Sequence, residues 1–382
     1  MTAEEILFCL LRNEICGTDL PKDFDLSDKT ADLYRLSNRH DIAHLTGDAL
    51  FRNKLISEGK AADFFRQRIV MAVYRYEKQA AELKRISDAF SAAGIEYIPL
   101  KGPVIRELYP EPWMRTSCDI DILIHEEDVE KATESLSESG FETDGKKNYH
   151  DIHFYCGDIH LELHFNICEN KKQLDVGLSK VWDYAEKVGD YEYRESPEYF
   201  VFHHIAHMAY HFLAGGCGIR PFIDLRILKQ KGFYSEEKLL PLFTESNLIR
   251  FYKSVCKLTD VWLGEGKHDD LTLQMEKYII SGGVYGNADN ANAAGAAESK
   301  GKRKYLLKAA FPPYKTMCII YPSLVKRKLL LPFYYIHRVF AKTFGKDRKR
   351  VKSKIDSTMS QSKDNIKTVD ELLKNLELYD ER

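Results

Sequence analysis

The chain has 382 residues, of which 44% are hydrophobic and 30% charged, and its formal net charge is -2. This length allows about two or three domains with a sizeable core, and the near-neutral charge argues against nucleic acid as the default partner. No apolar run approaches the ~20 residues of a membrane span, and the acidic N-terminal stretch does not resemble a signal peptide. Eight scattered cysteines without a CxxC pair favour a reducing cytoplasm over a disulfide framework.

Residues 1–92 are predicted to form an N-terminal helical domain, because apolar side chains recur at helical spacing over 62–92 and the pattern stops at Gly94. Residues 93–190 change to short apolar segments separated by turn residues, which predicts an α/β core. Its expected helices cover 101–109 and 127–139. Its expected strands cover 95–100, 118–124, 152–156 and 159–165, with Gly157-Asp158 as the turn of a hairpin.

Helical patterns return after Ser196 and predict a C-terminal helical domain over 191–340, followed by a basic segment and a terminal helix over 341–382. Residues 286–304 are small and polar without apolar periodicity, which predicts a mobile loop, with a linker as the alternative. The expected fold class is therefore α+β, with a small mixed sheet flanked by helical domains.

Two aspartates lie one residue apart in the strand-like stretch RTSCDIDILIH, residues 115–125. Alternation along a strand places Asp119 and Asp121 on one face, where two carboxylates repel each other unless a proton or a cation lies between them. Binding of Mg²⁺ between the two carboxylates commonly removes this repulsion. The alternative is a strand edge whose aspartates face water or pair with Arg115.

Two further segments carry polar residues in apolar surroundings. Lys101 and Gly102 lie where a strand passes into a helix, a place suited to phosphate binding, although an ordinary tight turn has the same pattern. Glu162 lies mid-strand and shares a face with His160 and His164. The alternative for Glu162 is the polar outer face of a hairpin.

Together these segments resemble the DNA polymerase beta-type nucleotidyltransferase superfamily. They are more closely similar to a bacterial group known as the uncharacterised nucleotidyltransferase family. The matching residues are Leu100-Lys101-Gly102, Arg115, Asp119-Ile120-Asp121 and Glu162-Leu163-His164. Glu162 replaces the aspartate usual in the group, and Gly102-Pro103 replaces the Gly-Gly or Gly-Ser pair of the superfamily. The resemblance extends over most of residues 60–340, including a His-rich helix, Arg220 with Asp224, and a Pro- and aromatic-rich pattern over 309–338.

The resemblance implies a metal-dependent nucleotidyltransferase that transfers a nucleoside monophosphate, with AMP from ATP as the first expectation, to a hydroxyl of a small molecule or a protein. Asp119, Asp121 and Glu162 would be the catalytic residues and the ligands of Mg²⁺ (or Mn²⁺). Lys101, Gly102 and Arg115 would bind the nucleotide, with Arg115 alternatively pairing with the aspartates. The acceptor side would be lined by His164, His207, Arg220 and Asp224.

Two other functions compete with this one. The first is a catalytically silent member that serves as a binding or regulatory module. The second is RNA or DNA end modification through the basic run 346–354, which lacks the interleaved aromatic residues typical of such surfaces.

His203, His207 and His211 recur every four residues and so share one helix face. They are interpreted as partly buried groups at a domain interface. The alternative is a zinc site with Asp224, although the string lacks the glutamate of a zinc-protease motif.

Overall fold

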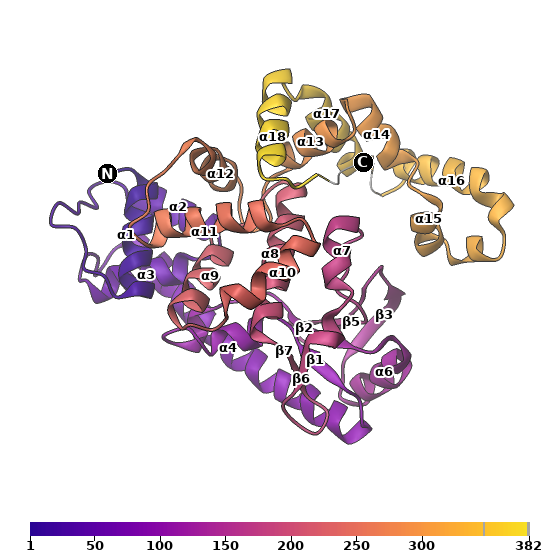
Figure 1. Cartoon of the computed structure of the whole chain (residues 1–382), viewed down its shortest axis with the longest axis horizontal. Coiled ribbons are helices and arrows are strands. Elements are labelled where there is room, and N and C mark those ends of the chain that lie inside the picture. The colour runs from indigo at the N-terminus through magenta and orange to yellow at the C-terminus, as the bar shows by residue number, and fades with distance from the viewer. Residues whose placement is uncertain (347, 380–382) are drawn as a thin grey trace.

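The computed structural model describes residues 1–346 and 348–379 and has the predicted α+β architecture, with helices around a mixed sheet (Figure 1). Four helices precede the first strand: α1 (Ala3–Cys16), α2 (Thr30–Arg39), α3 (Ala43–Arg52) and α4 (Lys60–Ala93). A capping box at Thr2 begins α1. Helix α4 ends at Gly94, whose positive φ of 64° allows the left-handed C-cap.

The main sheet has five strands in the order β1-β2-β5-β4-β3. They are β1 (Tyr97–Pro99), β2 (Ile120–Ile124), β3 (Glu142–Lys147), β4 (Asp151–Cys156) and β5 (Ile159–His164). The central pair, β2 and β5, is parallel, and its register sets Asp121 beside Glu162. The other pairs are antiparallel, and β4 and β5 form the predicted hairpin. Strand β3 was not among the predicted strands because its six residues are mostly polar and exposed.

The two faces of β2 and β5 differ in chemistry. Ile120, Ile122, Leu161 and Leu163 are buried on one face, where they form a hydrophobic cluster with residues of α4 and of α6 (Val129–Glu138). Asp121 and Glu162 therefore point to the opposite face. The short helix α5 (Gly102–Arg106) follows β1 and reaches this polar side through Lys101 and Gly102.

Further helices cover the polar side and share one hydrophobic core with α1–α3. They include α8 (Pro197–Leu213), α9 (Arg220–Gln230), α10 (Glu236–Glu245) and α11 (Ile249–Leu263). Phe8 of α1 and Trp262 of α11 stack in this core with ring centroids 4.6 Å apart. The connecting elements are α7 (Lys172–Leu178), the two-stranded sheet of β6 (Ala185–Lys187) and β7 (Tyr193–Glu195), and α12 (Asp270–Ile280). The domain boundaries given above stay a prediction.

The predicted mobile loop over 286–304 is instead largely helical, so that prediction was wrong. Helix α13 (Ala288–Glu298) is capped by Asn287, and its Ala293, Ala294 and Ala296 are buried. A Cβ on Gly295 would lie 2.3 Å from the Tyr305 ring, so the small side chains permit close packing. The Ala and Gly residues of this segment are small enough to be buried by close packing. They nevertheless give little of the apolar periodicity from which a helix is predicted.

The chain continues through α14 (Lys302–Ala310), α15 (Tyr314–Ile320), α16 (Leu331–Phe344), α17 (Arg348–Ser360) and α18 (Lys363–Asn375). The basic run 346–354 falls mostly on α17, with Asp347 outside the described residues. Among the described residues, no helix is long and apolar enough to cross a bilayer.

Buried His44 is expected to make stability fall at acidic pH. Its Nε2 lies 2.8 Å from the Met114 carbonyl, and burial lowers its pKa from 6.5 to about 4. Below pH 6.5 the unfolded chain therefore binds a proton that the folded protein does not, and the unfolding free energy decreases until about pH 4. This single group accounts for a loss of about 3 kcal/mol over that window.

Urea unfolding of His44→Gln, which keeps an N–H donor, should show a shallower loss of stability between pH 6.5 and pH 4 than the unaltered protein. The exposed His337 provides the matched control, because His337→Gln should leave the slope unchanged. Equal slopes for all three proteins would contradict this assignment.

Candidate active site

Asp121 and Glu162 lie side by side because β2 and β5 pair in parallel register. The His164 Nε2 atom lies 3.4 Å from Asp121 Oδ1 and 3.7 Å from Glu162 Oε2. One ligand atom from each of these three residues lies within 4.8 Å of the other two, close enough to hold a metal ion. Asp119 immediately precedes β2 and belongs to none of the tight ligand groups found among the described residues.

The carboxylates lack enough nearby positive charge to ionise together. Burial, followed by the charges of Asp121 and Asp119, raises the pKa of Glu162 to about 8. Burial and the Asp121 charge also raise the pKa of Asp119. Burial opposes the ionisation of Asp121, but the hydrogen bond and charge of His164, together with the charges of Lys101 and His203, lower its pKa overall. A divalent cation with oxygen preference fits this donor set, since it would supply the missing charge.

Lys101 is a cation that lines the same cavity as these carboxylates. It contributes to lowering the pKa of both Asp119 and Asp121, although burial of the two carboxyls acts more strongly in the opposite direction. Its backbone has a φ of 47°, uncommon for a residue other than glycine, where β1 passes into α5. Within the described part of the chain, no carboxylate lies within 4.0 Å of Lys101 Nζ in an ion pair, so this ammonium is available to an anion.

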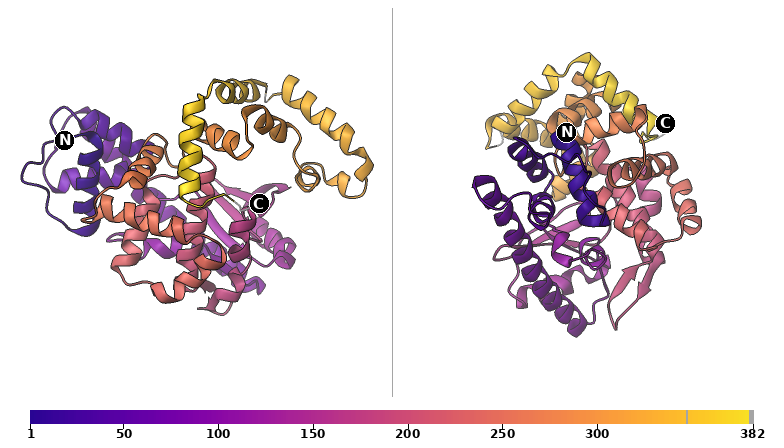
Figure 2. Two further views of the ribbon diagram at one scale, coloured as in Figure 1. Left: turned by 45° about the horizontal axis from the view of Figure 1, so that its top comes forward. Right: turned by 90° about the vertical axis from the view of Figure 1, so that its left-hand side faces the viewer.

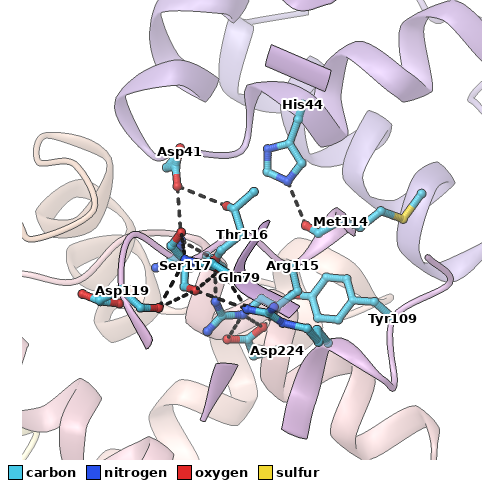
Figure 3. Close-up of polar contacts among 12 residues, drawn as sticks. Asp41, His44, Gln79, Tyr109, Met114, Arg115, Thr116, Ser117, Asp119 and Asp224 are labelled. Carbon is cyan, nitrogen blue, oxygen red and sulfur yellow. Dashed lines mark hydrogen bonds and ion pairs between the residues drawn. The ribbon is translucent and has the colours of Figure 1, made fainter. Parts of the chain in front are cut away.

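The segment that leads into the aspartates is fixed by the buried side chain of Gln79 on α4. Its Nε2 donates to the carbonyls of Ser117 at 3.2 Å and Asp119 at 3.4 Å, and its Oε1 accepts from Ser117 Oγ at 3.0 Å (Figure 3). Arg106 of α5 donates to the same Oε1. The sequence signal for Gln79 is a polar residue at a core position of the helical repeat, between Tyr76 and Leu83.

Arg115 forms a buried ion pair with Asp224 of α9. Its Nε lies 2.8 Å from Asp224 Oδ1, and the Tyr109 hydroxyl donates to the same oxygen at 2.6 Å (Figure 3). Arg115 Nη1 donates to the Thr116 carbonyl. The sequence allowed two roles for Arg115, which were binding a phosphate group of the nucleotide and pairing with the two aspartates. The structure provides a third partner, the residue that the resemblance assigned to the acceptor side.

Arg220 approaches the same segment from α9. Its Nη1 donates to the Thr116 carbonyl at 3.0 Å and to Asp41 Oδ2 at 3.3 Å. Its Nε atom is buried and has no hydrogen-bond partner in the part of the chain that the structure describes. Arg220 as a residue lines the cavity.

The histidines of α8 form a chain of contacts instead of a common metal site. His207 Nδ1 lies 3.0 Å from Glu169 Oε1, and His207 Nε2 lies 3.0 Å from His211 Nε2. His203 instead pairs with Glu195 at 2.7 Å. Burial lowers the pKa of His207 well below its usual value, so its imidazole is neutral. Among the described residues, these three histidines form no tight ligand group, and the zinc alternative gains no support.

A cavity of about 440 Å³ brings these residues together. All ten sequence-predicted site residues line it: Lys101, Gly102, Arg115, Asp119, Asp121, Glu162, His164, His207, Arg220 and Asp224. Glu169 and Tyr285 also line it and were missed. Glu169 follows β5 in a loop, and Tyr285 lies more than a hundred residues later, so only tertiary packing shows that they belong to the site.

A model of the uncharacterised nucleotidyltransferase family matches residues 27–264, which is more than half of the chain and includes every residue of the predicted site. The chain belongs to this family. The match begins before the expected region 60–340 and ends before the aromatic pattern over 309–338. Searches among curated proteins and among solved structures gave no match.

Breaking the ion pair between Arg115 and Asp224 is expected to destabilise the nucleotidyltransferase-family protein strongly. Asp224→Asn and Arg115→Gln should each lower the unfolding free energy by about 3–5 kcal/mol, because each leaves a charge or a donor buried without its partner. The double variant should cost less than the sum of the single changes. Lys84→Gln, which removes an exposed pair with Asp88, is the control and should leave urea unfolding nearly unchanged. Additive losses in the double variant would contradict a direct coupling.

Proposed function

We propose that the protein is a metal-dependent nucleotidyltransferase that transfers a nucleoside monophosphate, AMP from ATP as the first candidate, to a hydroxyl of a small molecule or a protein. The observation that carries the proposal is the pairing of Asp121 with Glu162 on adjacent strands, in a cavity that Lys101 also lines. Family membership supports the reaction class. A relation to the DNA polymerase beta-type superfamily is part of the proposal.

Asp119, Asp121 and Glu162 would hold Mg²⁺ or Mn²⁺, with Asp119 completing the set from the edge of the cluster. Such an ion, when bound, neutralises phosphate charge and polarises the phosphoryl group. Lys101 would bind phosphate oxygens, and the guanidinium of Arg220, which also lines the cavity, would add a second positive charge. In this proposal, these groups would hold the triphosphate against the carboxylate face of the sheet.

The reaction forms a bond between the acceptor oxygen and the α-phosphorus and breaks the bond from that phosphorus to pyrophosphate. The acceptor hydroxyl must lose its proton in this exchange, and Glu162 would orient that hydroxyl or take up its proton. In the proposed arrangement, Glu169 holds one nitrogen of neutral His207, whose other nitrogen faces His211. His207 would thereby hold His211, and His211, which also lines the cavity, would orient the acceptor hydroxyl on the α8 side.

A catalytically silent binding module is the competing proposal, and the position of Asp119 outside the tight ligand groups is the observation in its favour. The two differ in a measurable way. A silent module binds nucleotide without releasing pyrophosphate, whereas an enzyme releases pyrophosphate at least slowly with water as acceptor.

Removing the central carboxylates should abolish metal-dependent nucleotide binding. ATP, CTP, GTP and UTP are each tested with Mg²⁺ or Mn²⁺ in thermal unfolding, and a nucleotide present at 100 times its Kd adds about 2.7 kcal/mol of stability. Asp121→Asn and Glu162→Gln should lose this gain and lower pyrophosphate release by on the order of 10²-fold or more. Glu142→Gln, an exposed change on β3, is the matched control. Unaltered metal-dependent nucleotide binding in both Asp121→Asn and Glu162→Gln would contradict the proposal.

A change on the acceptor side should separate binding from transfer. His207→Gln is expected to keep the metal-dependent stabilisation by nucleotide but to lower transfer by on the order of 10²-fold, because His211, which orients the attacking oxygen, loses the imidazole that holds it. The readout is ATP labelled at its α-phosphate, with label followed onto protein, small molecules or water. Loss of nucleotide binding in this variant would place His207 on the nucleotide instead.

A further inference from the structure

Residues 302–346 form an arm with an unusual charge. The arm comprises α14, α15 and α16 with their short connections, and it projects from the body on the side away from α1–α3 (Figures 1 and 2). Its 45 residues contain eleven Lys and Arg and no Asp or Glu. The rest of the chain therefore carries a formal charge of -13 against +11 on the arm.

The arm also exposes large apolar side chains. Leu329 is 92% exposed, and Val325, Phe333, Ile336 and Phe344 are each 67% exposed. Helix α16 has no buried residue. Soluble surfaces rarely expose apolar side chains in such a continuous group unless it has a binding partner.

The exposed apolar residues of α16 form a stripe. Phe333, Ile336, Phe340 and Phe344 are spaced by three, four and four residues, so they lie on one face of the helix. The opposite face is held within the arm: the Tyr335 hydroxyl donates to the Pro312 carbonyl at 2.6 Å, and its ring meets Phe311 edge to face. The stripe thus points outward because internal contacts fix the other side.

Basic residues flank the stripe. Lys326, Arg327 and Lys328 are exposed immediately before α16, next to Val325 and Leu329, and Lys346 follows its end. An apolar helix face bordered by cations is the pattern of helices that lie in the interface of an anionic bilayer. The negative surface potential of such a bilayer attracts the basic side chains, while the apolar side chains insert at the boundary between headgroups and acyl chains.

We propose that the arm binds the surface of an anionic lipid bilayer, with the stripe of Phe333, Ile336, Phe340 and Phe344 inserted at the level of the headgroups. Two features favour lipid over nucleic acid or a protein groove. The stripe and its neighbours are largely aliphatic and phenyl groups, which prefer acyl chains, and the arm lacks any carboxylate that a membrane surface would repel. This inference does not depend on the proposed nucleotidyl transfer.

The test is co-sedimentation of the full chain with vesicles of phosphatidylglycerol and phosphatidylcholine, compared with phosphatidylcholine alone. The full chain should bind the anionic vesicles, and binding should weaken as salt increases. Replacing Lys326, Arg327 and Lys328 together by Gln should weaken binding roughly 100-fold, since each cation near the surface contributes about a factor of five. Phe340→Ser with Ile336→Ser should weaken it at least about tenfold.

Val70→Ser provides the matched control, because Val70 is an exposed apolar residue of α4, outside the arm. It should leave vesicle binding unchanged, and all variants should keep the thermal unfolding of the full chain. Three results would overturn the proposal. They are no preference for anionic vesicles, light scattering that shows a dimer lost in the Phe340 and Ile336 variant, or RNA binding that depends on the cations but not on the stripe.

Discussion

The dominant constraint in this fold is the negative charge gathered on one face of β2 and β5. Their parallel register places Asp121 against Glu162, and the register itself is fixed by Ile120, Ile122, Leu161 and Leu163 on the other face. A slip by one residue would bury the carboxylates and expose the isoleucines and leucines. The hydrophobic side of the sheet thus determines which groups the cavity receives, and Lys101 and His164 supply the partial compensation that the protein itself contains.

The remaining scaffold holds the segment before the aspartates from three directions. Gln79 reaches it from α4, the ion pair of Arg115 with Asp224 ties it to α9, and Arg220 joins it to Asp41 between α2 and α3. A loop with this many buried hydrogen bonds has few alternative conformations. The position of Asp119 is therefore set by helices that are distant in sequence, which explains how an aspartate outside regular β2 can still face the cavity.

Local patterns predicted much of this arrangement. Apolar alternation and turn residues identified four of the five strands of the main sheet, the hairpin turn at Gly157-Asp158 and the polar face of each strand that carries Asp121 or Glu162, because those features depend on neighbours in the chain. That the two faces meet was implied only by the family resemblance. The tertiary partners of the site residues could not be predicted from local patterns. Arg115 contacts Asp224, which lies more than a hundred residues away in the chain, and Glu169 and Tyr285 line the cavity from connecting segments. Helix α13 was not predicted because its buried alanines and its glycine give no apolar periodicity. Close packing against Tyr305 stabilises this helix.

Charge distribution shows the limit of arguing from whole-chain composition. A net charge of -2 gives no reason to expect an anionic partner, yet it conceals an arm of +11 and a remainder of -13. The two regions need opposite counter-charges: the carboxylates of the cavity need cations, and the arm needs an anionic surface. Because interactions between exposed charges decay within about 8–10 Å in physiological salt, charges farther apart than this do little to neutralise each other. The binding partner of each region therefore has to be predicted from the charge of that region, because the net charge of the whole chain describes neither region.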